Sequence, residues 1–147
     1  PELNEASASA HAYDRKQCDW SSADVVATAF AFAGLKETYE PGPLSIDLTN
    51  EGKEFHELNV VRVKDGVTES AEALIQLSQE DAFEKVDYIG TIDAIGPGTS
   101  DYLVLDLEPG RYVVSCFLPK GATDMDHLDA DGLPHALSGM FAEFTVA

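Results

Sequence analysis

The chain has 147 residues, enough for one domain with a two-layer core and too few for two domains of ordinary size. Twenty-seven acidic residues against nine basic ones give a formal net charge of −18, which repels phosphates and argues against nucleic acid binding. Hydrophobic residues make up 44% of the chain, but no apolar run approaches the ~20 residues of a membrane-spanning helix. We therefore expect a soluble, acidic protein whose protein partners carry basic docking surfaces.

Residues 1–22 are small, polar and without periodicity, so we expect an N-terminal arm or linker, followed by one domain over residues 23–147. The sequence begins at Pro1 without a basic and apolar leader, so we expect that any targeting peptide has been removed. Two cysteines, Cys18 in the arm and Cys116 in the domain, permit one disulfide or two separate thiols. His11, also in the arm, has no role that the pattern assigns.

The first predicted strand begins at Val25, where β-branched, aromatic and small residues are mixed. Turn residues over 39–43 precede the alternating segment 44–48, and turn residues over 50–53 precede the apolar segment 55–63. Two such segments joined by turn residues predict an antiparallel pair over residues 44–63.

The second half of the chain predicts one helix and three further strands. Residues 68–75 form a short amphipathic run with Thr68 as a plausible cap, so we expect one short inserted helix. A weak strand or loop follows, and stronger strands are predicted over residues 102–107, 111–118 and 140–146. Short strands separated by Gly and Pro turns predict an all-β sandwich.

The stretch between residues 116 and 140 combines one thiol, imidazoles and a thioether. A copper site that changes oxidation state uses such a mixture, because sulfur suits the reduced ion and nitrogen the oxidised ion. A second imidazole ligand from outside this stretch is available at His56, just after the turn over residues 50–53. The sequence therefore predicts a copper site that contains Cys116, with His56 as the candidate for the imidazole from outside this stretch.

The sequence resembles the cupredoxin family, the plastocyanin-like and azurin-like blue copper proteins, over residues 25–147. TNEGKEFHEL is similar to the segment that presents their first histidine ligand, and PGRYVVSCF resembles the strand that ends at their cysteine ligand. The segment from Gly132 to Met140 resembles their second histidine and axial methionine, with four residues between His135 and Met140. This resemblance implies a Greek-key β-sandwich that binds one copper ion through His56, Cys116, His135 and Met140, and that either transfers single electrons or carries the metal. Glu57 and carbonyl groups of the long loop are expected as supporting partners of these ligands. It also implies a divergent bacterial member, secreted or in the cell envelope, that is monomeric and is not an enzyme.

One feature departs from the family: eighteen residues separate Cys116 from His135, where cupredoxins usually have only a few. Such a loop can fold outward while its ends stay close, because the entropy cost of loop closure grows slowly with length. The same length is also consistent with a site that has lost its metal. The alternative prediction is then a metal-free, cupredoxin-like interaction or structural module of the cell surface, with loop 119–134 as its contact surface and a Cys18–Cys116 disulfide.

Other residues of the loop offer weaker alternatives. His127 is a substitute for His135 as a ligand, although it leaves the spacing to Met140 unexplained. Four aspartates resemble a calcium loop only superficially, because they lack the alternate-residue spacing and the closing glutamate, and we expect them to be solvated loop charge: Asp124, Asp126, Asp129 and Asp131. We find no nucleophile motif and no phosphate-binding loop, so an enzyme is the weakest hypothesis.

Overall fold

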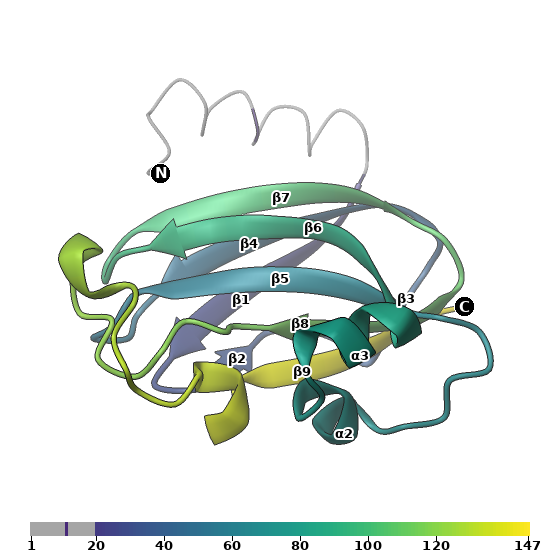
Figure 1. Cartoon of the computed structure of the whole chain (residues 1–147). Helices are drawn as coiled ribbons and strands as arrows, with labels where there is room; N and C mark the ends of the chain where they lie inside the picture. Colours follow the sequence, from purple (N-terminus) through teal and green to yellow (C-terminus); the bar gives the residue numbers. More distant parts are fainter. Residues whose placement is uncertain (1–10, 12–19) are drawn as a thin grey trace.

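Two β-sheets packed face to face make up the domain in the computed structural model, which describes residue 11 and residues 20–147 (Figure 1). The four-stranded sheet has the order β2-β1-β4-β7, with bounds Ala31–Ala33, Ser21–Thr28, Gly42–Asn50 and Ser100–Leu107. The five-stranded sheet has the order β3-β9-β8-β5-β6, with bounds Thr38–Tyr39, Phe141–Val146, Gly110–Ser115, His56–Val63 and Val86–Ile95. Strand β1 is parallel to β4 and β3 is parallel to β9, whereas the other pairs are antiparallel. The predicted all-β sandwich is confirmed.

Alternating apolar residues of both sheets fill the space between them. Leu44, Ile46 and Leu48 of β4 are fully buried, as the alternation in the sequence requires. Tyr112 of β8 stacks on Phe144 of β9 with ring centroids 5.1 Å apart, and its hydroxyl donates to the Glu108 carbonyl at 2.7 Å. These contacts fix β8, the strand that leads directly to Cys116.

The antiparallel pair predicted over residues 44–63 is wrong. Strand β4 pairs with β1 and β7 in one sheet, whereas β5 pairs with β6 and β8 in the other. The turn after Asn50 therefore crosses between the sheets. Turn residues predict only that the chain changes direction. Whether the next strand forms a hairpin or crosses to the other sheet depends on which strands it pairs with.

Two short helices, not one, follow β5. Helix α2, Ala71–Ile75, begins after Ser70, whose hydroxyl accepts from the Ala73 N–H, so the predicted cap at Thr68 is also wrong. Helix α3, Gln79–Lys85, begins in the same way after Ser78. Both helices lie beside the outer face of the five-stranded sheet (Figure 1), where α2 buries Leu74 in a second apolar cluster with Val113 of β8. The sequence missed α3 because it buries none of its residues and so has no apolar stripe.

The predicted arm over residues 1–22 lies almost entirely outside the described residues, so its boundary with the domain stays a prediction. Strand β1 begins at Ser21, four residues before the predicted first strand. His11 is buried: its Nε2 lies 2.8 Å from Asp47 Oδ1, and its ring stacks on Tyr102 at 3.6 Å. Among the described helices, none is long and apolar enough to cross a membrane.

Candidate metal centre

His56 is the first residue of β5, and the turn before it is held by Asn50 at the end of β4. The fully buried Asn50 amide donates to the carbonyls of Glu54 and Ile95, both at 2.9 Å, and accepts from the Gly52 N–H at 2.8 Å. Gly52 itself lies against the imidazole, because a Cβ at this position would stand 2.8 Å from His56 Nε2. The turn residues seen in the sequence thus place His56 in the interior.

Cys116 follows the last residue of β8 and is completely buried. Its backbone N–H donates to the Met140 carbonyl at 3.2 Å, and its carbonyl accepts from the Ala136 N–H at 2.7 Å. Its sulfur accepts from the Glu57 N–H at 3.5 Å. The position of the thiol is therefore set by the pairing of β8 with its neighbouring strands. The backbone hydrogen bonds of Cys116 to Met140 and Ala136 also hold the segment that contains His135 beside it.

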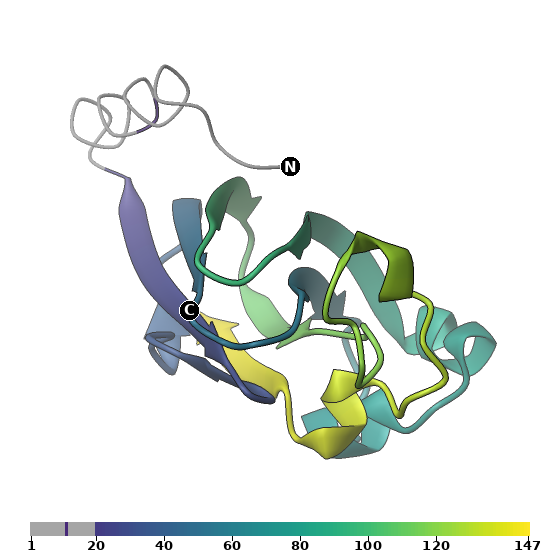
Figure 2. The same ribbon diagram turned by 90° about the vertical axis from the view of Figure 1, so that its left-hand side faces the viewer.

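The long loop between Cys116 and His135 has ends that lie close together. The His135 N–H donates to the Leu118 carbonyl at 2.8 Å, and the Lys120 N–H donates to the Leu133 carbonyl at 2.9 Å. In the end view of Figure 2 the loop and the short helix η2, His135–Ser138, lie at the end of the molecule that faces the viewer. The eighteen intervening residues thus form a surface excursion whose ends place His135 beside Cys116.

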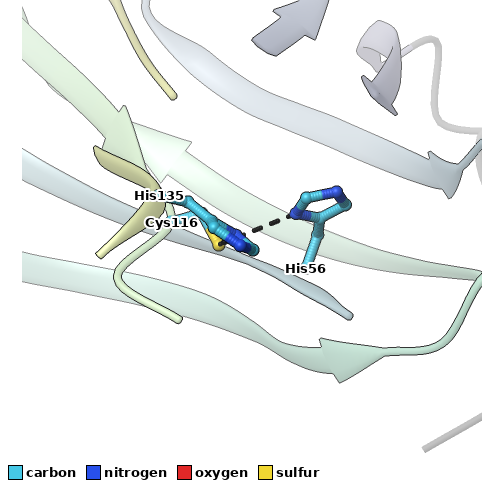
Figure 3. Close-up of side chains that lie close together, drawn as sticks. All are labelled: His56, Cys116 and His135. Atoms are coloured by element: carbon cyan, nitrogen blue, oxygen red, sulfur yellow. Dashed lines mark hydrogen bonds between the residues drawn. The ribbon is translucent and has the colours of Figure 1, made fainter. Parts of the chain in front are cut away.

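Three predicted ligands meet at one point. Cys116 Sγ lies 3.4 Å from His135 Nδ1 and 4.0 Å from His56 Nδ1 (Figure 3), and donor atoms of all three residues lie within 4.8 Å of one another. A metal ion with bonds of ~2.3 Å to sulfur and ~2.0 Å to nitrogen, the lengths known for zinc, would hold a sulfur and a nitrogen ligand about 3.5–3.8 Å apart. The two distances from Cys116 Sγ, 3.4 Å and 4.0 Å, lie on either side of this range. Met140, the fourth predicted ligand, is completely buried in the same apolar cluster as Cys116, and its N–H donates to the His135 carbonyl at 3.1 Å.

Burial keeps His56 and Cys116 uncharged at neutral pH. Desolvation, reinforced by the neighbouring His135, lowers the pKa of His56 to about 4. Desolvation also raises the pKa of the Cys116 thiol to about 12, although the Glu57 and Leu118 N–H groups oppose this shift. His56 Nε2 is buried and has no hydrogen-bond partner among the described residues. The site therefore holds a neutral imidazole and a thiol whose proton a metal ion would have to displace.

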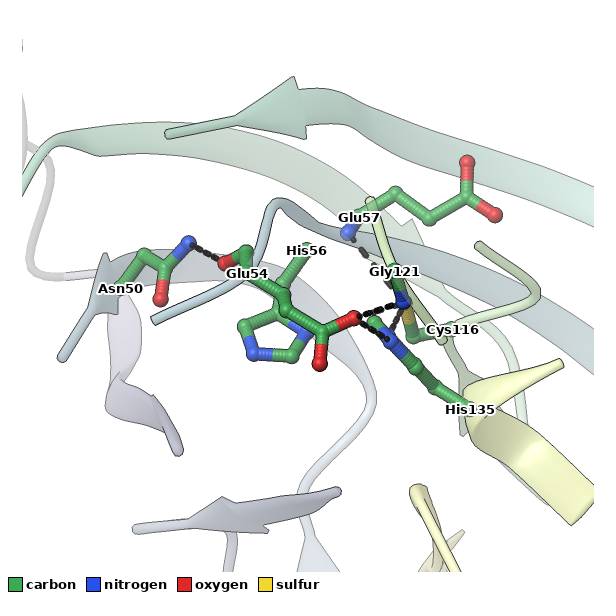
Figure 4. A network of polar contacts seen from close by, with 7 residues as sticks. All are labelled: Asn50, Glu54, His56, Glu57, Cys116, Gly121 and His135. Atoms are coloured by element: carbon green, nitrogen blue, oxygen red, sulfur yellow. Dashed lines mark hydrogen bonds and ion pairs between the residues drawn. The ribbon is translucent and has the colours of Figure 1, made fainter. Parts of the chain in front are cut away.

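Glu54 is a residue of this site that the sequence analysis missed. Its Oε1 lies 3.2 Å from His135 Nε2 and accepts from the Gly121 N–H at 2.6 Å (Figure 4). Burial acts to raise the pKa of Glu54, but the Gly121 and His135 contacts outweigh it and lower the pKa. The one available signal was an acidic residue two positions before a predicted histidine ligand. Glu57, which the sequence favoured instead, contacts neither imidazole, and its carboxylate accepts from the N–H of Phe117 at 3.1 Å.

The remaining loop residues lie apart from this cluster. His127 is exposed and its Nδ1 lies 2.6 Å from Asp124 Oδ1, so it does not replace His135. The four aspartates of the loop are all exposed, as expected of solvated charge. Cys116 carries a free thiol, which removes the support for a Cys18–Cys116 disulfide, and Cys18 itself lies outside the described residues.

No family model and no curated protein matches this sequence. The fold, however, matches that of solved structures. Auracyanin from the photosynthetic bacterium Roseiflexus castenholzii superposes with a TM-score of 0.54 and 19% identity, covering 86% of this chain and 97% of auracyanin. Rusticyanin from Thiobacillus ferrooxidans gives 0.52 and 17%, covering 86% and 78%. Auracyanin A, a blue copper protein from Chloroflexus aurantiacus, gives 0.50 and 12%, covering 86% and 98%. These proteins are cupredoxins, so the chain has the cupredoxin fold.

Proposed function

We propose that the protein is an extracytoplasmic cupredoxin that binds one copper ion and either transfers single electrons or carries the metal. The observation that supports this most strongly is the meeting of one thiol and two imidazole Nδ1 atoms inside the core. A buried group of this composition has no packing advantage over aliphatic side chains, because each polar atom must be desolvated. Binding of a shared metal ion compensates for that cost.

Each residue has a distinct role in the proposed site. Cys116 supplies the thiolate once its proton is displaced, His56 and His135 supply nitrogen ligands, and Met140 supplies a weak axial thioether. The bound copper supplies one-electron chemistry by alternating between its two oxidation states. The protein contributes a buried, preformed set of ligand atoms, so that these ligands would move little when the bound copper gains or loses an electron.

We propose a carrier of electrons or copper rather than an enzyme. The predicted ligands are all buried: His56 is 1% exposed, and Cys116, His135 and Met140 are 0% exposed. A substrate therefore has no path to the donor atoms in this conformation, whereas electrons can cross the protein between buried and surface groups. Carriage of copper requires the loop to open, and electron transfer does not.

The proposed location is the periplasm, the cell envelope or the extracellular medium, and the proposed state is a monomer. The net charge of −18 supports a soluble protein that meets basic partners by electrostatic steering. We propose that the partner is a redox protein or a copper-delivery protein with a basic surface.

Addition of one equivalent of Cu(II) to the reduced, metal-free protein tests the copper assignment. We expect an intense visible charge-transfer band that is absent from the Cys116→Ser variant, because only a copper-bound thiolate produces it. Binding of Cu(I) by competition with a chelator provides a second measurement. If the wild type gives no band and does not compete for Cu(I), the metal-free interaction module is the better description.

A further inference from the structure

Neither histidine of the proposed site reaches the protein surface. His135 is 0% exposed: Glu54 contacts its Nε2, and the Phe30 ring lies 4.9 Å from the imidazole. Lys120 in turn lies over Phe30, with its Nζ 4.9 Å from the ring centroid. His56 is only 1% exposed. Neither imidazole therefore offers appreciable surface to a partner protein.

Phe117 links Cys116 to the protein surface. It follows Cys116 directly in the chain, and 45% of it is exposed. Its backbone N–H is held at 3.1 Å by the Glu57 carboxylate, and the N–H of Glu57 in turn contacts the Cys116 sulfur. Phe117 thus reaches the thiol both through a covalent bond and through a short hydrogen-bonded path.

Phe117 lines a groove of about 620 Å³ on the outer face of the five-stranded sheet, beside α2 and α3. The groove also contacts Ser115 and Pro134, the residues that directly precede Cys116 and His135. Among the described residues seven large hydrophobic side chains are exposed, and four of them line this groove: Phe83, Tyr88, Phe117 and Leu137. So much exposed apolar surface in one place is typical of an interaction site, most of all in a strongly acidic protein.

Acidic side chains lie on the helix that forms one wall of the groove. Helix α3, which contributes Phe83, also carries three exposed acids, Glu80, Asp81 and Glu84. The nearby cations already have acidic partners: Lys85 Nζ lies 2.9 Å from Glu69, and Lys64 Nζ lies 3.9 Å from Asp87. The groove is therefore largely apolar and carries exposed acidic side chains on its α3 wall, an arrangement complementary to an apolar patch flanked by lysine and arginine.

We infer that this groove is the docking site of a redox partner protein with a basic, apolar-centred surface, and that Phe117 is the contact through which the electron passes. The inference rests on the proposed copper function. In the exchange the partner's centre loses one electron and the copper held by Cys116 gains it, or the reverse, and no bond is made or broken. The helical segment between β5 and β6 then serves as one wall of the docking site.

Titration of the ¹⁵N-labelled protein with a basic c-type cytochrome at low ionic strength tests the docking site. We expect amide shifts at Phe83, Tyr88, Phe117 and Leu137, and weaker binding as salt is added. Phe83→Glu should weaken the complex about tenfold or more, because it places a charge at the centre of an apolar contact. Val104→Glu, at an exposed apolar residue of β7 in the other sheet, is the matched control and should leave affinity unchanged.

Several outcomes would overturn the inference. They are the absence of saturable binding, shifts confined to the exposed loop residues 123–131, and equal effects of Phe83→Glu and Val104→Glu. Dimerisation that Phe83→Glu abolishes would instead assign the groove to a second copy of the chain. Because docking is followed by NMR on the metal-free and the copper-loaded protein in parallel, failure of docking is distinguishable from failure of copper binding. At a saturating concentration of reduced cytochrome, where binding no longer limits the rate, electron transfer measured by stopped flow should be slower in Phe117→Leu than in the wild type. An unchanged saturated rate would overturn the role of Phe117.

Discussion

The carboxylate of Glu54 lies 3.2 Å from Nε2 of His135, on the side of the imidazole opposite the Cys116 sulfur. A carboxylate acceptor at Nε2 favours the tautomer that carries its proton there, so the lone pair of Nδ1 faces the sulfur, 3.4 Å away. The same Glu54 oxygen accepts from the Gly121 N–H at 2.6 Å. One side chain thus orients a proposed ligand and fixes the start of the long loop above it.

Removal of this carboxylate should weaken metal binding. We expect Glu54→Ala to lower the affinity for Cu(I) by about 10–100-fold, the usual effect of losing a partner that orients a histidine ligand. Glu54→Gln, which keeps an acceptor, should recover part of the loss. Chelator competition measures the affinity, and ¹⁵N NMR of the metal-free protein reports the His135 tautomer. Glu51 is an exposed acidic residue in the same turn, so Glu51→Ala is the control. If both alanine variants lower the affinity for Cu(I) equally, the effect comes from the lost negative charge and not from the orientation of His135.

Acid should destabilise the metal-free protein through His56. The folded-state pKa of about 4 lies below the ordinary 6.5, so the unfolded chain binds more protons between these values. The contribution to stability is complete above pH 6.5 and is lost as the pH falls towards 4, an effect on the order of 3 kcal/mol. Urea unfolding between pH 4 and 7 measures it. Because carboxylates also titrate in this range, the wild type is compared with His56→Gln, and the contribution of His56 is the difference between their free energies of unfolding at each pH. If the free energies of the two proteins change with pH in the same way, the loss of stability does not come from His56.

The Cys116 thiol should resist modification in the native protein. It is 0% exposed and its pKa is raised to about 12, so almost no thiolate is available at pH 8. In a Cys18→Ser background we expect iodoacetamide to alkylate Cys116 rapidly only after denaturation, as followed by mass spectrometry. Rapid alkylation under native conditions would mean that the segment around Cys116 opens readily.

Gly52 should be required for the position of His56. A methyl group there would stand 2.8 Å from His56 Nε2 and 3.2 Å from Asn50 Oδ1, so Gly52→Ala should cost about 1–3 kcal/mol and weaken metal binding. Gly66→Ala is a useful comparison, since its φ of +85° strains any side chain while open space surrounds it. That variant should lose stability in urea but keep its affinity for copper. A loss of affinity in both variants would indicate general destabilisation.

Met140 should tune the proposed site without being needed to form it. Met140→Leu keeps the volume of this fully buried side chain but removes the thioether. We expect the visible copper–thiolate band to persist and the reduction potential to rise, because the oxidised ion loses a donor. Spectroelectrochemistry measures both quantities. An unchanged potential would show that the Met140 sulfur does not contact the metal.

The strands that could be predicted from the sequence were those with a clear local pattern of apolar or β-branched residues. The alternation in β4 and the β-branched run before Cys116 both identified strands, because each side chain that faces a core must be apolar. Soft donors near the end of the chain predicted a metal site that includes Cys116, and the resemblance to cupredoxins selected His135 and Met140 as its further ligands. The helix Gln79–Lys85 was missed because it buries none of its residues and therefore leaves no periodic signal. The error at residues 44–63 arose because turn residues favour a change of direction without specifying the strand that pairs next.

By itself the sequence determined the all-β class, the strands that lead to the proposed ligands, and the types of donor atom available. Only the tertiary structure decided that His56 approaches Cys116 from sixty residues away, that Glu54 contacts His135, and that an apolar groove opens beside Phe117. The physical reason is that periodicity and turn preferences depend on neighbouring residues in the chain. Contacts between remote residues depend on how the two sheets pair and pack, which no local pattern specifies.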